Sequence, residues 1–173
     1  LVGGGGCGGS CDPNGVKALA DRAGKVATTP HIRNSVLTVN QEARDLFAEK
    51  VVRMLGGSVK DKKIGVLGLS FKADTDDMRE SPAIDIIKRL QEQGAKIQAF
   101  DPVGMGASRE SLDGIKYCDD AYGAAEGADA LLLITAWNEF KQLDMRRLRE
   151  AMNGSVFVDG RNIYDPVEMR DAG

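Results

Sequence analysis

Residues 62–87 read KKIGVLGLSFKADTDDMRESPAIDII. The apolar run over 62–69 predicts a buried strand, because short apolar runs bounded by turn residues are typical of parallel sheets. Ser81 and Pro82 predict a helix N-cap and first helical position, and the apolar residues that follow at three- and four-residue steps predict one helix face ending at Gly94. The stretch therefore predicts a strand, a long connection and a helix.

The same alternation continues downstream. Further strands are expected at 96–100, 115–118, 129–135 and 155–160, and further helices at 119–126 and 144–152. Strands that alternate with helices pair in parallel through right-handed crossovers. The sequence therefore predicts an α/β fold, a Rossmann-like doubly wound parallel sheet, within 58–173.

A long helix is expected upstream of this sheet. Residues 31–55 contain no Gly or Pro, and their apolar residues recur at three- or four-residue steps, which predicts one helix face. Residues 1–15 read LVGGGGCGGSCDPNG and predict a loop. The chain therefore divides into a loop and partial helical middle region at 1–57 and a sheet domain at 58–173.

Composition limits the function classes. The 173 residues are 42% hydrophobic and 28% charged with a net charge of -3, so we expect a packed core and no general affinity for nucleic acid or anionic membranes. No apolar run reaches the roughly 18 residues of a membrane span. Three Cys, an odd number, disfavour a disulfide framework, so we expect a protein of the reducing cytoplasm. A single His disfavours a Cys/His metal site, so no bound metal is expected. The missing initial Met suggests a piece of a longer chain.

Ligands of doubly wound sheets bind beyond the carboxyl ends of the strands. There the connection 70–81 carries Lys72 and Arg79 and ends at a helix N-terminus, a favourable place for an anion. A solvated acidic loop is the alternative. The turn lacks GxGxxG and is a poor NAD fingerprint.

Three further residues have two readings each. Arg161 could bind a phosphate or a hydroxyl-rich ligand through paired donors, or could hold its own loop through Asp159 or Asp165. Asp101 could meet a ribose hydroxyl or cap a loop. Cys11 could be a nucleophile in a glycine-rich nest, or an incidental thiol.

Five segments, in this order, resemble the UDP-glucose/GDP-mannose dehydrogenase family. They are GGSC at 8–11, GLSFKADTDDMRESPAIDII at 68–87, FDPVGM at 100–105, TAWNEF at 135–140 and DGRNIYDP at 159–166. The resemblance covers nearly the whole chain but only the C-terminal part of the family. It is strongest to bacterial UDP-glucose 6-dehydrogenases, with GDP-mannose and UDP-N-acetylmannosamine dehydrogenases as alternatives.

The resemblance implies an NAD-dependent, two-step oxidation of UDP-glucose to UDP-glucuronate through a cysteine thiohemiacetal and thioester. The nucleophile falls on Cys11. The other implied contacts are Gly8, Phe71, Lys72 and Arg161 with the UDP-sugar substrate, and Arg79 and Asn14 with NAD.

The resemblance also implies a homodimer built by the helix at 31–55. The family's NAD-binding domain with its GxGxxG is absent, so the chain is expected to be inactive alone. Asp12, Asn14 and Gly15 replace the family's Phe, Lys and Asp beside the nucleophile. A non-catalytic UDP-sugar-binding and dimerisation module is the alternative function.

Overall fold

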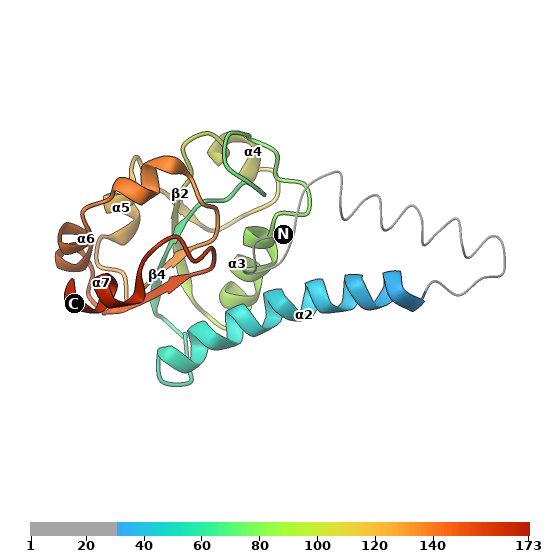
Figure 1. Cartoon of the computed structure of the whole chain (residues 1–173), viewed down its shortest axis with the longest axis horizontal. Coiled ribbons are helices and arrows are strands. Elements are labelled where there is room, and N and C mark those ends of the chain that lie inside the picture. The colour runs from blue at the N-terminus through green and yellow to red at the C-terminus, as the bar shows by residue number, and fades with distance from the viewer. Residues whose placement is uncertain (1–30) are drawn as a thin grey trace.

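The computed structural model describes residues 31–173, with side chains from residue 35 onward. At the centre of this part of the chain lies a parallel sheet of five strands in the order β3-β2-β1-β4-β5 (Figure 1). The strands are β1 (Lys63–Leu67), β2 (Lys96–Phe100), β3 (Lys116–Tyr117), β4 (Ala130–Leu133) and β5 (Val156–Asp159). From β1 the chain builds one side of the sheet and then crosses to the other, so the predicted doubly wound α/β fold is confirmed.

Helices connect and cover the strands. The described helices are α2 (His31–Met54), α3 (Pro82–Glu92), α4 (Met105–Ser108), α5 (Ala121–Ala125), the 3-10 helix η1 (Asn138–Gln142), α6 (Met145–Ala151) and α7 (Pro166–Asp171). The predicted cap of α3 is present, because Ser81 Oγ accepts a hydrogen bond from the backbone N–H of Ala83 and Pro82 opens the helix.

Two hydrophobic clusters fill the two faces of the sheet. Successive side chains of a strand point to opposite faces. Ile64 and Val66 of β1 therefore join the cluster with the apolar residues of α2 and α3, whereas Leu131 and Leu133 of β4 join the cluster with those of α5 and α6. Gly65 faces α5 so closely that a Cβ would stand 2.2 Å from the carbonyl oxygen of Ala124. Only glycine fits at this position.

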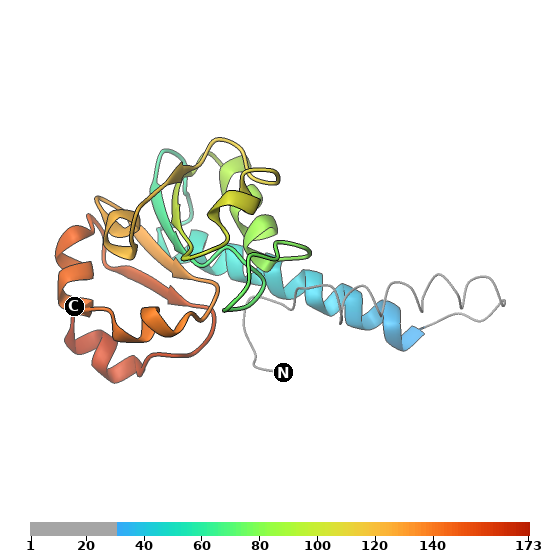
Figure 2. The same ribbon diagram turned by 90° about the horizontal axis from the view of Figure 1, so that it is seen from above.

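The sheet domain covers only part of the predicted apolar face of the long helix α2. Phe47 and Val51 are buried against the sheet domain, whereas Val36, Val39 and Leu46 are 50%, 61% and 60% exposed. The N-terminal turns of α2 extend beyond the domain (Figures 1 and 2). The last turns of α2 thus belong to the core of the sheet domain, and the division between 1–57 and 58–173 stays a prediction.

Candidate functional site

A buried carboxylate joins the loops at the carboxyl edge of the sheet. Asp101, which follows β2, has no exposed surface. Its carboxylate accepts hydrogen bonds from the backbone N–H groups of Leu69, Ser70, Val103 and Gly104 at 2.7, 3.1, 3.0 and 2.6 Å and from Trp137 Nε1 at 3.2 Å. The donors come from the loops after β1, β2 and β4. Of its two predicted roles, Asp101 has the loop-capping one.

The charge of Asp101 is stabilised by these donors. Burial alone would raise the pKa of the carboxyl, but the hydrogen bonds from the backbone of Gly104, Leu69, Ser70 and Val103 outweigh burial and lower the pKa below its usual value. Asp101 therefore carries a negative charge at neutral pH and fixes the loops without contacting solvent.

Arg161 links the loop after β5 to two others. Its Nε donates to the carbonyl of Ile134 at 2.7 Å, and its Nη2 donates to the carbonyl of Phe71 at 3.2 Å. Its backbone N–H donates to Asp159 Oδ1 at 2.8 Å. The guanidinium therefore lies where the loops that follow β1, β4 and β5 meet.

The contact with Phe71 brings three of the predicted substrate residues into one neighbourhood. Lys72 follows Phe71 directly, is exposed, and has its Nζ 5.4 Å from the centroid of the Phe71 ring. Within the described residues Lys72 forms no ion pair. Phe71, Lys72 and Arg161 thus lie together at the carboxyl edge, and their roles toward a substrate stay predictions.

Arg79, the predicted NAD contact, lies at the other end of the loop 70–81. Its side chain is 67% exposed, and its Nε and Nη2 donate to the two carboxylate oxygens of Asp77 at 3.0 and 2.7 Å. These side-chain hydrogen bonds, with one from the Arg79 backbone, lower the pKa of Asp77. Arg79 lines an open hollow of about 680 Å³ whose wall also holds Asp76, Glu80 and Glu110. The hollow is therefore mainly acidic.

The turn between β1 and α3 does not fit a dinucleotide by itself. In Rossmann folds that bind NAD, backbone N–H groups of this turn approach the pyrophosphate. Here the N–H groups of Leu69 and Ser70 are bound by Asp101, and Ser81 caps α3. Within residues 63–82, the turn after β1 therefore offers no cradle for a pyrophosphate, in agreement with the missing GxGxxG.

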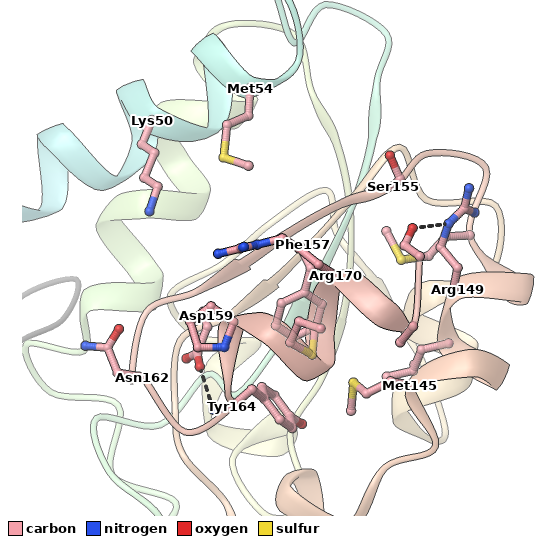
Figure 3. Close-up of a pocket in the computed structure, with 16 residues that line it drawn as sticks. Lys50, Met54, Met145, Arg149, Ser155, Phe157, Asp159, Asn162, Tyr164 and Arg170 are labelled. Atoms are coloured by element: carbon pink, nitrogen blue, oxygen red, sulfur yellow. Dashed lines mark hydrogen bonds between the residues drawn. The ribbon is translucent and has the colours of Figure 1, made fainter.

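A second hollow lies along the flank of β5 and extends to the loop that follows this strand (Figure 3). It measures about 520 Å³, and α2, β5, α6 and α7 contribute its walls, with Met54, Met145, Phe157, Tyr164 and Met169 among the apolar lining. The Tyr164 hydroxyl donates to the carbonyl of Phe140, and burial first, then Asp159, raises the pKa of this phenol. None of the described predicted site residues lines this hollow.

The remaining predicted site residues, Gly8, Cys11 and Asn14, lie outside the described residues. Among the described side chains of residues 31–173, no group of three or more from His, Cys, Asp and Glu could hold a metal ion. No helix in the same range is long and apolar enough to cross a bilayer.

Comparison with known proteins identifies the family. The model of the UDP-glucose/GDP-mannose dehydrogenase family, UDP binding domain, matches residues 65–166. The UDP-glucose 6-dehydrogenase of Rhizobium meliloti is 42% identical over the whole chain, and that of Bacillus subtilis is 36% identical over 97% of it. The chain spans only 40% and 36% of the lengths of these two relatives.

A solved structure agrees with this match. The UDP-glucose dehydrogenase of the hyperthermophilic archaeon Pyrobaculum islandicum superposes on 95% of the chain with a TM-score of 0.82 at 32% identity, and the chain covers 37% of that protein. The family match includes every loop that meets at Asp101 and Arg161, from the turn after β1 to the start of α7. The chain belongs to the UDP-glucose/GDP-mannose dehydrogenase family and contains its UDP-binding domain.

Proposed function

We propose that the chain is the C-terminal part of an NAD-dependent UDP-glucose 6-dehydrogenase and binds the UDP-sugar at the carboxyl edge of its sheet. The meeting of Arg161 with the Phe71–Lys72 loop carries the proposal, because it sets two cationic residues on neighbouring loops at the edge where such folds bind ligands. The relatives named UDP-glucose 6-dehydrogenases support the sugar. GDP-mannose and UDP-N-acetylmannosamine are the alternative substrate types.

In this proposal each cation has its own part. The Arg161 guanidinium already donates to two carbonyls, so it both holds the loops together and offers charge to a diphosphate. Lys72 follows the residue whose carbonyl Arg161 contacts and is exposed, and its flexible ammonium suits the sugar hydroxyls or the diphosphate oxygens. Phe71 supplies the ring beside the ammonium.

The proposed chemistry uses Cys11 and its loop. The Cys11 thiolate adds to the C6 aldehyde of the oxidised sugar to give a thiohemiacetal. Oxidation of the thiohemiacetal gives a thioester, which water hydrolyses to the uronate with release of the thiol. Gly8, in the same glycine-rich segment, contacts the substrate.

NAD would be the oxidant of such a reaction. The turn after β1 offers no pyrophosphate cradle, and the proposed contacts of this chain with NAD are those of Arg79 and Asn14. The chain alone is therefore proposed to be inactive. A non-catalytic UDP-sugar-binding and dimerisation module is the second candidate, and the same lack of a cradle favours it.

We also propose a homodimer formed through α2. Val36, Val39 and Leu46 are at least half exposed and recur at steps of three and seven residues on one side of the helix. Apolar stripes of this kind are typical of helix–helix contacts between subunits.

Titration calorimetry with UDP tests the proposed binding site. We expect the chain to bind UDP weakly and Arg161→Ala to lose about 1.5–3 kcal/mol of binding free energy, the range for hydrogen bonds to a charged group. Lys72→Ala should lose less, because its amine is exposed to solvent. Arg79→Ala should bind UDP like the parent, because Arg79 lies at the acidic end of the loop and pairs with Asp77.

The variant series separates the proposed roles. If Arg79→Ala lost the most affinity and Arg161→Ala none, the assignment of UDP to the carboxyl edge would be wrong. GDP in place of UDP serves as the ligand control, since tighter binding of GDP would favour GDP-mannose over a UDP-sugar as the substrate.

A further inference from the structure

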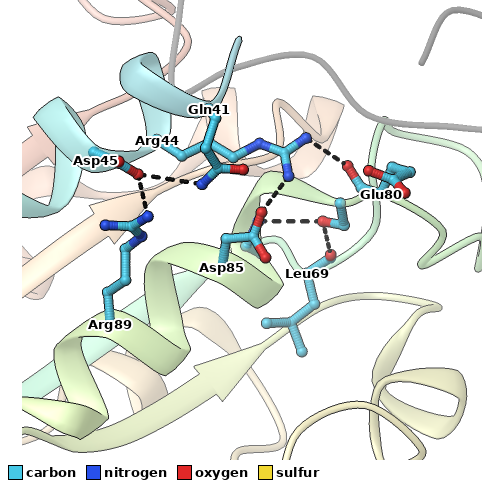
Figure 4. A network of polar contacts seen from close by, with 9 residues as sticks. Gln41, Arg44, Asp45, Leu69, Glu80, Asp85 and Arg89 are labelled. Atoms are coloured by element: carbon cyan, nitrogen blue, oxygen red, sulfur yellow. Dashed lines mark hydrogen bonds and ion pairs between the residues drawn. The ribbon is translucent and has the colours of Figure 1, made fainter. Parts of the chain in front are cut away.

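A buried arginine of α2 reaches the loop that carries the candidate ligand residues. The Arg44 side chain is only 4% exposed. Its Nη1 forms an ion pair with Asp85 in the first turn of α3, and its Nη2 donates to the main-chain carbonyl of Glu80 at 3.1 Å (Figure 4). One guanidinium therefore contacts both α3 and the last part of the loop 70–81.

The contacted carbonyl belongs to a residue with an uncommon backbone conformation. Glu80 has φ +55°, in the left-handed region that residues with a Cβ rarely adopt. Such conformations persist where the surroundings hold them. Glu80 directly precedes Ser81, whose Oγ donates to the carbonyl of Leu69 at 2.6 Å and also caps α3. The hydrogen bond from Arg44 thus holds the loop where it turns into the helix.

The opposite end of the loop is held from the sheet domain. Asp101 accepts from the N–H groups of Leu69 and Ser70, and Arg161 donates to the carbonyl of Phe71. In the sequence, Lys72 and Arg79 lie between the residues bound by Asp101 and Arg161 and the Glu80 carbonyl bound by Arg44. The loop is therefore anchored at its distal end by a residue of α2, the helix proposed to form the subunit contact.

We propose that Arg44 is a positioning residue that fixes the loop 70–81 through its contacts with Glu80 and Asp85. The packing of α2 against α3 would thereby influence ligand affinity at the carboxyl edge. The coupling rests on the proposed UDP site. The planar fork of arginine suits two acceptors in different directions, whereas the single ammonium of lysine does not. Arg44→Lys therefore keeps the charge and loses the double contact.

The opposing view is that Arg44 merely joins α2 to α3. A second ion pair provides a matched control, because Arg89 and Asp45 connect the same two helices with Nη2 and Oδ1 2.5 Å apart. Asp45 is the neighbour of Arg44, and Arg89 lies one turn beyond Asp85. Neither belongs to the loop. If joining the helices were the whole role, Arg44→Lys and Arg89→Lys would have the same consequences.

The experiment measures amide hydrogen exchange over 70–81 and UDP affinity by calorimetry in the parent, Arg44→Lys and Arg89→Lys, well below each melting temperature. For Arg44→Lys we expect loop exchange about tenfold faster and UDP binding about threefold to thirtyfold weaker, the range for coupling through a packed network. Arg89→Lys should stay within about twofold of the parent in both. Should Arg44→Lys not fold, Asp85→Asn loosens the same contact and should change both quantities in the same direction.

Each other outcome overturns one proposal. Equal exchange and equal affinity in the Arg44 and Arg89 variants would remove the positioning role, as would faster loop exchange with unchanged UDP affinity. A parent that binds no UDP would overturn the proposed site. The exchange rates would then still decide whether Arg44 fixes the loop, and unchanged rates would overturn that as well.

Discussion

Asp101 shows how a single residue orders the carboxyl edge. A buried carboxylate is costly unless donors surround it, and here the donors are backbone N–H groups of loops that would otherwise be unsatisfied. The same bonds tie the loop of Lys72 to the end of β2. The candidate ligand residues therefore depend on a side chain that is not expected to touch the ligand.

Replacing this carboxylate should destabilise the fold. In Asp101→Asn the amide nitrogen faces donors and cannot accept from them, so we expect a loss of at least about 3 kcal/mol in the free energy of unfolding, given ~1.5–3 kcal/mol per hydrogen bond to a charged group. Urea unfolding of the parent and the variant at neutral pH measures this difference in the free energy of unfolding. The exposed Asp76, changed to Asn, removes the same charge and should alter stability by less than about 0.5 kcal/mol.

The pH dependence follows from the lowered pKa of Asp101. Because the folded pKa lies below the unfolded value of about 3.9, the unfolded chain binds more protons in this range and stability falls as the solution is acidified. The contribution is complete above about pH 4–5 and disappears as the pH falls through the folded pKa. The stability difference between parent and Asp101→Asn should therefore shrink below about pH 4. A stability difference that stayed constant with pH would argue against an ionised carboxylate at Asp101.

Residue identity alone could not settle these roles. The position of Asp101 after a predicted strand allowed both a ribose contact and a loop cap, and the choice depends on which N–H groups the fold brings to it. Arg161 was proposed from its place after the last strand, and its role toward a ligand stays a prediction. Arg44 gave no signal, because an arginine in a long helix is usually solvated and only the packing of α2 on α3 buries it.

At the scale of elements, the sequence predicted every strand and most helices of the described residues. The long apolar patterns gave α2, α3 and the strands β1, β2, β4 and β5 within a few residues of their observed ends. The predictions at 115–118, 119–126 and 144–152 also agree with the short elements β3, α5 and α6. The short helices α4, η1 and α7 were not predicted, and so few residues do not repeat a helical period. Asp165 and Pro166 were nevertheless a usable signal for α7, since Asp165 caps it and Pro166 opens it.

The exposed side of α2 should decide the oligomeric state. A charge within the stripe would be buried without a partner in a dimer, so Leu46→Glu should weaken self-association by at least about tenfold. Light scattering at increasing concentration measures the mass, and the parent should approach that of two chains.

A control on another element distinguishes the stripe from general surface effects. Val167 of α7 is 59% exposed, much like Leu46, and belongs to a different helix from the stripe. Val167→Glu should leave the mass of the parent unchanged. A parent that remains a single chain at every concentration, or loss of the dimer in both variants, would contradict an α2 interface.

For the whole molecule, the question is how much of the reaction this chain can perform. It spans 40% of the length of the Rhizobium meliloti relative. Its described residues include the loops proposed to bind a UDP-sugar, while the turn after β1 has the N–H groups of Leu69 and Ser70 bound by Asp101. Binding and oxidation should therefore separate: UDP binds, and no electrons are transferred.

An assay of NADH absorbance with NAD and UDP-glucose tests this separation. We expect the chain at micromolar concentration to give the same rate as its Cys11→Ala variant, with no burst, because no cradle in the turn after β1 places a nicotinamide against the sugar. The same samples should bind UDP by calorimetry, which shows that they are folded and that the lack of oxidation is specific. NADH formation in the parent above the Cys11→Ala rate would contradict the expected inactivity, and would place a working dinucleotide site within these 173 residues.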